Sequence, residues 1–312
     1  MYRINVLIIT YNQEDLISRS VDSILIQKEF GLNKIVVSDD CSKDKTWDIL
    51  NEYKSLYPDI FVLNRNNPNL GILQNVSKLV SIRSDADFYL FLAGDDSYCN
   101  GFLEEVQRVA TENNIKPEDD AVIYSNWKTV FPDGREVIFD SSRVTKGLNP
   151  FSLYIRGKVS RGCVISKGVI DKFRPLVLDQ GLMLAEASFD VQKHYLAKRV
   201  LYTPFISNVY NASVGVSTKL NNTDYYTKQA ERSTQFLLDN YATTNKDKFY
   251  LKYQIASNKC KTSFSLSLFF KMIYYYIRGY LPGAGTGVKP LMIRVKSIFE
   301  SLMQKKNNNN KV

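Results

Sequence analysis

The chain has 312 residues, of which 44% are hydrophobic, so it can bury a substantial core and is not mainly disordered. Its formal charge is +9, but residues 246–312 hold 13 Lys and Arg against 2 Asp and Glu, whereas residues 1–245 hold 28 against 30. Because the basic excess is confined to the C-terminal tail, the sequence does not indicate a uniformly basic nucleic-acid-binding protein, and we expect no nucleic-acid partner.

The cysteine and histidine content restricts the chemistry further. Four cysteines show neither a C-x-x-C pair nor the spacing of a metal site, which indicates reduced thiols. The single histidine, His194, argues against Ser-His-Asp, Cys-His and multi-histidine centres. Any acid–base work is therefore expected from carboxylates. The first apolar run is too short for a signal peptide and lacks a cleavage site, so we expect a cytoplasmic protein.

Strand and helix patterns alternate over the first hundred residues. Buried strands are predicted at 4–9, 34–38, 60–63 and 88–92, separated by helices whose apolar residues recur at helical spacing around 17–25, 47–53 and 72–80. Such alternation predicts an α/β fold with a mostly parallel, Rossmann-like sheet flanked by helices.

Polar clusters follow three of these strands: Thr10-Tyr11, Asp39-Asp40 and Asp95-Asp96. Because the carboxyl ends of parallel strands share one edge of a sheet, we expect these clusters to form one ligand site. No glycine-rich phosphate loop follows a strand, and the glycine run at 283–287 is interpreted as a linker. Carboxylates without such a loop indicate a nucleotide held through Mn²⁺ or Mg²⁺.

The middle of the chain is less regular. It predicts a strand at 122–126, a turn at 132–134, a short strand at 161–166 and a helix at 184–198, which together complete the sheet and build the second wall of a cleft. The expected organisation is two halves of one domain, a helical tail and a disordered end, at 1–105, 106–245, 246–306 and 307–312.

Four segments together resemble the ordered motifs of the glycosyltransferase family 2 enzymes, which have a GT-A fold: residues 8–13 (IITYNQ), 36–46 (VVSDDCSKDKT), 69–72 (NLGI) with Asn75, and 91–98 (FLAGDDSY). The likeness covers about residues 3–105. It implies an inverting, metal-dependent transferase that moves a sugar from a nucleoside diphosphate, a UDP-sugar, to a lipid-linked or growing glycan acceptor. It also implies a setting in bacterial surface polysaccharide synthesis, such as lipopolysaccharide or capsule.

The resemblance assigns donor-site roles by position. Thr10 and Tyr11 match residues that contact the base and ribose, Asp39 matches the acid that accepts the uracil N3–H, and Asn75 matches a donor-site position. The alternatives are structural: Asp39, Asp40 and Asp44 could cap the helix that follows them, and Asn75 could be a helix-surface residue.

The resemblance also assigns a metal site. Asp95 matches the last acid of the family's D-x-D motif, with Asp96 beside it as a second metal ligand, whereas Ala93 stands where the first acid is usual. The alternative for Asp95 and Asp96 is an ordinary turn. Asn211 replaces the arginine that usually follows a tyrosine in relatives, so no cation is assigned there to the leaving diphosphate.

Inverting transfer needs a carboxylate base that removes the proton of the acceptor hydroxyl. Relatives supply it from a Glu-Asp pair that opens a helix, which aligns with Glu186 and Ala187 here. Glu186, Asp190 and His194 are predicted on one helical face, so either carboxylate is a candidate base. The alternative is a solvated face on which Asp190 pairs with His194.

The tail predicts two amphipathic helices. Their apolar positions are Phe264, Leu268, Phe269, Met272, Ile273, Tyr276, Ile277 and Tyr280 in the first, and Leu291, Val295, Ile298, Phe299 and Leu302 in the second. Basic charge and aromatic residues on helices too short to span indicate peripheral binding to the anionic inner face of the plasma membrane. The alternative is that both stripes pack on the transferase domain or form a dimer interface.

Two rival functions remain open at this point. A catalytically inactive, nucleotide-sugar-binding subunit of a polysaccharide assembly is motivated by Ala93 and Ala187. A nucleotidyltransferase is disfavoured, because no glycine-rich loop bearing Arg and Lys follows the first strand.

Overall fold

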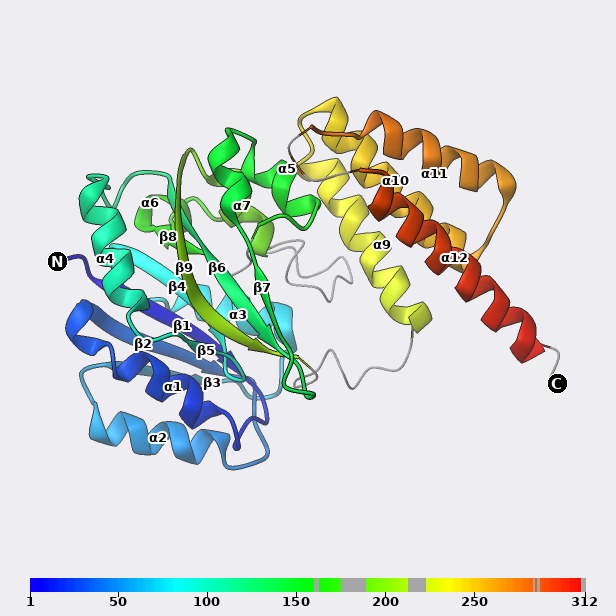
Figure 1. Ribbon diagram of the computed structural model, residues 1–312. Coiled ribbons are helices and arrows are strands. Elements are labelled where there is room, and N and C mark those ends of the chain that lie inside the picture. Colours follow the sequence, from blue (N-terminus) through cyan, green and yellow to red (C-terminus); the bar gives the residue numbers. More distant parts are fainter. Residues whose placement is uncertain (160–162, 175–188, 213–222, 283, 285–286, 310–312) are drawn as a thin grey trace. The chain divides into compact units, whose positions relative to one another are not determined.

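A computed structural model describes residues 1–159, 163–174, 189–212, 223–282, 284 and 287–309 (Figure 1). The chain divides into two compact units, which comprise residues 1–220 and 221–312. The described part of the first unit is α/β, and that of the second is helical.

The first unit begins with four parallel strands in the spatial order β3-β2-β1-β4. Helices α1, α2 and α3 connect them, which confirms the predicted alternation. The bounds are β1 Ile4–Thr10, α1 Ile17–Leu25, β2 Leu32–Asp39, α2 Thr46–Leu56, β3 Phe61–Arg65, α3 Ile72–Ser81 and β4 Phe88–Ala93. A short 3-10 turn, η1 (Lys28–Phe30), precedes β2.

The core explains why β1 is apolar at consecutive positions. Ile4, Val6 and Ile8 belong to one cluster with the buried faces of α1, α2 and α4 (Phe102–Glu112). Leu7 alternates with them and is equally buried, on the side where α3 contacts β1 and β2. A strand buried on both faces reads as a continuous apolar run.

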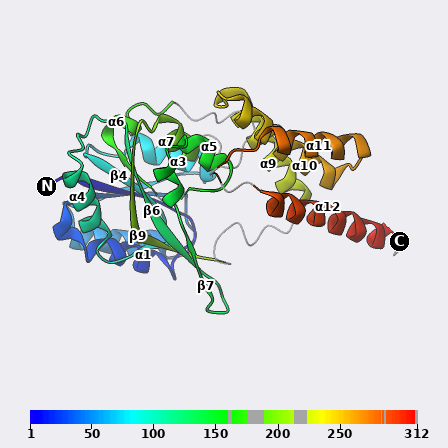
Figure 2. The same cartoon turned by 45° about the horizontal axis from the view of Figure 1, so that its top comes forward.

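The rest of the first unit extends this sheet. Its elements are β5 Ser97–Tyr98, β6 Ala121–Val130, β7 Glu136–Phe139, η2 Ser142–Lys146, α5 Pro150–Ile155, β8 Val164–Ser166, α6 Lys167–Ile170, α7 Val191–Leu196 and β9 Arg199–Asn211. The strands continue the order as β8-β6-β9-β5, and β7 pairs with β6 (Figure 2). β8 runs antiparallel to both β4 and β6, whereas β6 and β9 are parallel. This half of the sheet is therefore mixed. In addition, β6 and β7 form an antiparallel hairpin rather than a crossover unit.

Two predicted elements are only partly described. Of the strand predicted at 161–166, residues 164–166 are described as β8, and residues 161–162 fall outside the described chain, as do residues 184–188 of the helix predicted at 184–198. The helix predicted at 184–198 is described as α7, which ends at Leu196 because Ala197 is extended. The amides of Lys198 and Arg199 donate instead to the carbonyl of Asp120 at the start of β6.

The second unit consists of α9 (Thr223–Asn240), α10 (Asn245–Thr262), α11 (Leu266–Arg278) and α12 (Val288–Asn309). The division falls after Leu220 rather than after residue 245, because α9 packs on α10. Helix α12 includes residues 307–309, where the asparagine run had predicted disorder. None of the helices in the described ranges has both the length and the apolar character that a membrane span requires.

The packing of the tail differs from the membrane-facing prediction. Met272 and Tyr276 of the predicted α11 stripe are buried with residues of α10, and Ile298 of the α12 stripe is buried in the same cluster. Partly buried Leu268, Phe269, Ile273, Leu291 and Val295 pack around them. Much of both stripes is therefore covered by helices of the second unit itself.

Candidate active site

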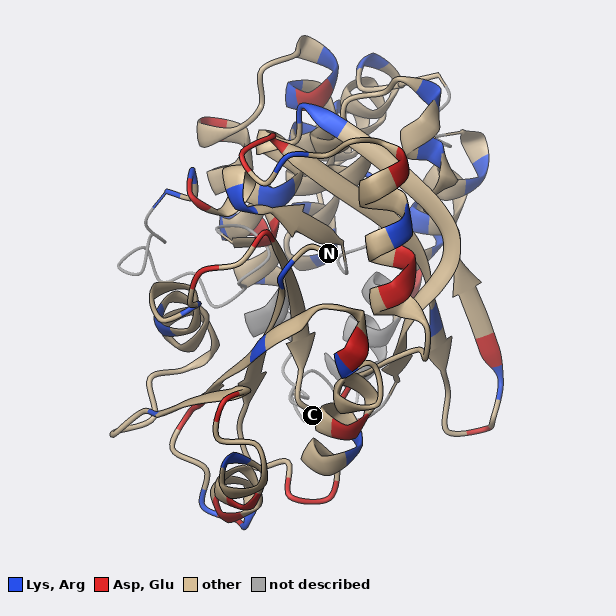
Figure 3. Cartoon of the chain, turned by 90° about the vertical axis from the view of Figure 1, so that its left-hand side faces the viewer, with Lys and Arg blue, Asp and Glu red and all other residues tan. Residues whose placement is uncertain are grey.

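The three polar clusters meet at one edge of the sheet, as predicted. Thr10 pairs in register with Asp39 of β2, and Ile9 pairs with Ala93 of β4, so the loops after β1, β2 and β4 start side by side. Acidic and basic residues are interspersed along the loops and helices of this unit, as Figure 3 shows.

Hydrogen bonds join the first two loops. The Asp40 amide donates to the Thr10 carbonyl at 2.9 Å, and the Asn12 amide donates to the Ser42 hydroxyl at 2.9 Å. The Gln13 amide donates to the hydroxyl of Thr46 at 2.8 Å. These hydrogen bonds satisfy backbone amides of both loops and hold the two loops together.

Asp39 is completely buried at the end of β2. Its carboxylate accepts hydrogen bonds from the amide of Ser42, at 3.1 Å, and from the Ser42 hydroxyl, and the Arg65 Nε atom lies 3.6 Å from Oδ2. Burial raises the pKa of Asp39, although these contacts oppose the rise. These contacts fix the orientation of the carboxylate at the end of β2.

Asp40 does not cap the helix that follows it. Its oxygens accept from the amides of Leu70 and Gly71, both at 2.8 Å, in the loop that leads into α3. Asp44, which was also predicted as a cap, does accept from the Thr46 amide at the start of α2, at 3.0 Å. The difference arises because loop 66–71 folds back over the end of β2, a contact between segments about thirty residues apart.

Asn75 is buried within α3, so the helix-surface alternative is wrong. Its side-chain amide donates to the Ser38 carbonyl at 3.0 Å, and its oxygen accepts from Asn66 at 2.9 Å. Asn66 also donates to Asp40 at 2.9 Å. This chain of amides holds the 66–71 loop against the end of β2.

The other two predicted donor residues differ in exposure. Thr10 is buried, and its hydroxyl donates to the Gln13 side chain at 2.7 Å. Tyr11, the next residue, is 39% exposed at the rim. The described contacts therefore show Thr10 shaping the loop, while the ring of Tyr11 is accessible.

Asp95 and Asp96 form the turn after β4, and both are partly buried. Burial raises the pKa of Asp95, and burial together with the Asp95 carboxylate raises the pKa of Asp96 to about 7. Two adjacent carboxylates that repel each other in a partly dry turn fit a divalent cation, which would neutralise both. Ala93 contributes no oxygen, and the described residues contain no group of three acids, histidines or cysteines arranged to hold a metal. The remaining ligands of such an ion would have to be water or substrate oxygens.

The sequence did not reveal a cation at this turn. The guanidinium of Arg19, on α1, donates to the Asp95 carbonyl at 2.7 Å, and its charge acts on both carboxylates. The side-chain amide of Asn211 donates to the same carbonyl at 3.1 Å. Arg19 lies 76 residues before Asp95, and its helical pattern gave no sign of the contact.

Gly94 allows the turn after β4 to approach the loop after β1 closely. A Cβ atom at Gly94 would lie 2.3 Å from the Gln13 side-chain oxygen and 2.9 Å from the Thr10 hydroxyl. A larger residue would force the Gln13 side chain to move and would crowd the Thr10 hydroxyl, so glycine permits this close approach.

Of the two candidate bases, Glu186 lies outside the described residues, whereas Asp190 immediately precedes α7. The Nζ atom of Lys193 is 2.5 Å from a carboxylate oxygen of Asp190. Lys193 is almost completely buried, and its Nζ lies 5.3 Å from the ring of Phe91 in β4 and 5.4 Å from the ring of Phe189. The ion pair therefore packs on the strand that ends at the acidic turn.

The alternative pairing of Asp190 with His194 on a solvated face is wrong. His194 is buried, its Nδ1 lies 2.9 Å from the Tyr124 hydroxyl oxygen, and its ring stacks on Tyr154 with centroids 4.4 Å apart. Burial lowers the pKa of His194 to about 3, so the imidazole is neutral. The histidine is part of the packing between α7 and β6.

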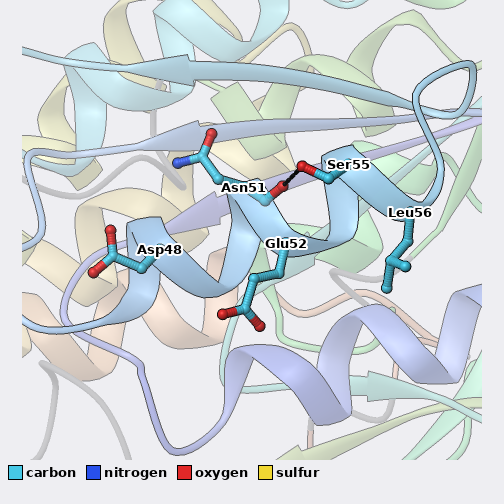
Figure 4. Close-up of a pocket in the computed structure, with 5 residues that line it drawn as sticks. All are labelled: Asp48, Asn51, Glu52, Ser55 and Leu56. Carbon is cyan, nitrogen blue, oxygen red and sulfur yellow. Dashed lines mark hydrogen bonds between the residues drawn. The ribbon is translucent and has the colours of Figure 1, made fainter.

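A separate depression lies along α2 and is lined by Asp48, Asn51, Glu52, Ser55 and Leu56 (Figure 4). All five residues belong to one helix, and the hydroxyl of Ser55 donates to the Asn51 carbonyl within it. This is an open outer face of a single helix, without groups converging from other elements, and it adds nothing to the site at the sheet edge.

Comparison with known proteins gives a consistent picture. A model of the family described as Glycosyl transferase family 2 matches residues 5–161. The poly(ribitol-phosphate) beta-glucosyltransferase of Bacillus spizizenii is 35% identical over 99 residues, which are 30% of this chain and 15% of that protein. The chain spans about a third of the length of the first curated relatives it matches, which are uncharacterised Mycobacterium proteins.

Solved structures share the fold at low identity. S. aureus TarS (residues 1–349), solved in complex with UDP-GlcNAc, superposes with a TM-score of 0.59 at 16% identity, over 88% of this chain and 79% of that chain. The mannosyltransferase PcManGT of Pyrobaculum calidifontis, solved with GDP-Man and Mn²⁺, gives a TM-score of 0.54 at 14% identity, over 97% and 84% of the two chains.

Proposed function

Because the chain belongs to glycosyl transferase family 2 and has the GT-A-type fold of its structural neighbours, we propose that it is an inverting glycosyltransferase that uses a nucleoside diphosphate sugar. The observation that carries the proposal is the single sheet edge at which Asp39, Asp95 and Asp96 come together from β2 and β4.

The proposed donor is a UDP-sugar. A buried, oriented carboxylate at Asp39 suits one N–H donor of a base, and uracil presents such a group at N3. Tyr11 would lie against the base and ribose, with Thr10 and Asn75 holding the two loops that flank them. The TarS structure contains UDP-GlcNAc, whereas that of PcManGT contains GDP-Man, so both nucleotides belong in the test.

The proposed cofactor is Mn²⁺ or Mg²⁺, held by Asp95 and Asp96. When bound, the ion would neutralise negative charge on the donor's diphosphate as the sugar leaves. Arg19 adds a positive charge at the same turn, which supports a role for Arg19 in stabilising the leaving diphosphate. Asn211, which stands where relatives have an arginine, does not supply that charge.

The proposed base is Glu186 or Asp190. A carboxylate in this role removes the acceptor hydroxyl proton as the oxygen attacks the anomeric carbon opposite the diphosphate. The ion pair with buried Lys193 supports this role for Asp190, because it holds Asp190 beside β4, the strand that ends at the acidic turn.

The proposed acceptor is a growing glycan or a lipid-linked saccharide of a bacterial surface polysaccharide, made at the inner face of the plasma membrane. The name of the Bacillus relative, a poly(ribitol-phosphate) beta-glucosyltransferase, supports a polymer as the class of acceptor. The alternative is an inactive nucleotide-sugar-binding subunit, which Ala93 favours because it removes one metal-binding oxygen.

A donor panel tests the proposal. UDP-, GDP- and dTDP-sugars are incubated with Mn²⁺ or Mg²⁺ and a cell-envelope glycan fraction, and release of the nucleoside diphosphate is measured. We expect release from a UDP-sugar by the parent and not by Asp95→Asn. Binding of UDP without release from any donor or acceptor would support the inactive subunit, and absence of nucleotide binding would contradict both.

A further inference from the structure

Helix α11 has a second apolar face, of which the predicted stripe included only Ile277. Leu266, Phe270, Tyr274 and Ile277 recur at i, i+4, i+8 and i+11 and are 68%, 66%, 52% and 64% exposed. The opposite face of the helix, at Met272 and Tyr276, is buried against α10. Single exposed apolar residues are ordinary, but four in one row form a patch that indicates a contact with another molecule.

The charge around this patch is of one sign. Lys271 and Arg278 are exposed on α11 next to the apolar row. Between Asp247 and Glu300 the chain holds nine Lys and Arg and no Asp or Glu. We propose that the outer face of α11, defined by Leu266, Phe270, Tyr274 and Ile277 with Lys271 and Arg278, docks on an anionic lipid bilayer.

The dimensions of α11 require it to lie along the surface. Its 13 residues are about 20 Å long, which is shorter than the ~30 Å hydrocarbon core of a bilayer. A helix in the interface buries its apolar row at the boundary of headgroups and acyl chains, while Lys and Arg reach the lipid phosphates. Tyrosine, with an apolar ring and a polar hydroxyl, suits the same depth.

The charge also argues against a second copy as the occupant. A two-fold contact through this face would bring Lys271 and Arg278 of both copies together, with no acidic residue nearby in either sequence to offset them. An anionic membrane supplies the opposite charge along the whole row.

Point substitutions are the appropriate test, because deleting α11 and α12 would uncover Tyr253 and Cys260 of α10. The full chain is sedimented with vesicles of mixed phosphatidylcholine and phosphatidylglycerol, and with phosphatidylcholine alone. We expect the parent to bind the mixed vesicles. Phe270→Ser with Ile277→Ser should weaken binding at least about tenfold, and Lys271→Gln with Arg278→Gln should weaken it by about fivefold per charge.

Val137→Ser with Ile138→Ser is the matched control, since these residues are also exposed apolar neighbours but lie on β7. It should bind vesicles like the parent, and all variants should retain the parent's melting temperature. The proposal is overturned if the parent fails to bind mixed vesicles, if the α11 variants bind as well as the parent, or if the control loses binding equally. It is also overturned if the parent forms a lipid-free dimer that the α11 variants abolish.

The inference extends the proposed membrane location and is independent of sugar transfer. Transfer to a free oligosaccharide should be unchanged in the α11 variants. A variant that loses vesicle binding but keeps transfer therefore reports on the α11 surface. A variant that loses transfer but keeps vesicle binding reports on the proposed active site at the sheet edge.

Discussion

The sheet edge of the first unit and the outer face of α11 are built on opposite principles. At the sheet edge, Asp39, Asp40 and Asn75 are buried, and each is held by hydrogen bonds from other segments. On α11, Phe270 and Ile277 are mostly exposed. A site that must distinguish one base from another needs acceptors fixed in advance, whereas a fluid lipid surface needs only apolar area and charge.

The largest expected effect is on the rate of sugar transfer, and it should leave membrane docking unchanged. If Asp190 is the base, Asp190→Asn should slow single-turnover transfer by ~10²–10⁴-fold, because an amide cannot take the acceptor proton. UDP affinity and vesicle binding should stay at the parent's values. Glu186→Gln is the comparison variant: loss of transfer there, with Asp190→Asn fully active, would move the base to Glu186, and full activity in both would place it elsewhere.

The next effect tests how far the sheet edge depends on its internal contacts. Asp40→Ala removes the acceptor for the amides of Leu70 and Gly71 and for Asn66, so it should lower the free energy of unfolding by about 1–3 kcal/mol. Denaturant unfolding measures it. Asp40→Asn keeps one acceptor oxygen and should lose less. Equal stability of Asp40→Ala and the parent would show that loop 66–71 does not need these hydrogen bonds.

The smallest effect uses the only histidine. Because the pKa of His194 is lowered to about 3 in the folded chain, its contribution to stability is complete above its unfolded pKa and is lost as pH falls toward 3. Between about pH 7 and pH 5.5 the parent should lose roughly 1 kcal/mol more stability than His194→Phe. Tyr124→Phe, which retains the histidine, should keep the parent's pH dependence. Identical pH profiles for the parent and His194→Phe would mean that the imidazole titrates in the folded protein.

The sequence predicted those features that depend on local periodicity. Consecutive buried residues in β1 and the polar residues at the carboxyl ends of β1, β2 and β4 were enough to place Thr10, Asp39 and Asp95 on one edge. Parallel strands bring their ends together regardless of side-chain detail, so this part of the site follows from strand order alone.

Features that depend on contacts between distant segments were not predictable in this way. Asp40 reaches the start of α3, Arg19 reaches the turn after β4, and Lys193 rather than His194 pairs with Asp190. On α11 the pattern showed an apolar helix but not which face α10 covers, because residues of that helix are apolar on more than one side. Packing partners decide these contacts, and periodicity carries no information about them.

The central claim is that Asp39 and Asp95 together bind a uridine nucleotide with a divalent ion. Calorimetric titration of UDP into the parent, Asp39→Ala and Asp95→Asn, with and without Mn²⁺, tests it most directly. The account predicts Mn²⁺-dependent binding to the parent, binding to Asp39→Ala that is weaker by about 1–3 kcal/mol, and no Mn²⁺ dependence in Asp95→Asn. Equal, Mn²⁺-independent binding of UDP to all three proteins, or no binding to the parent, would contradict it.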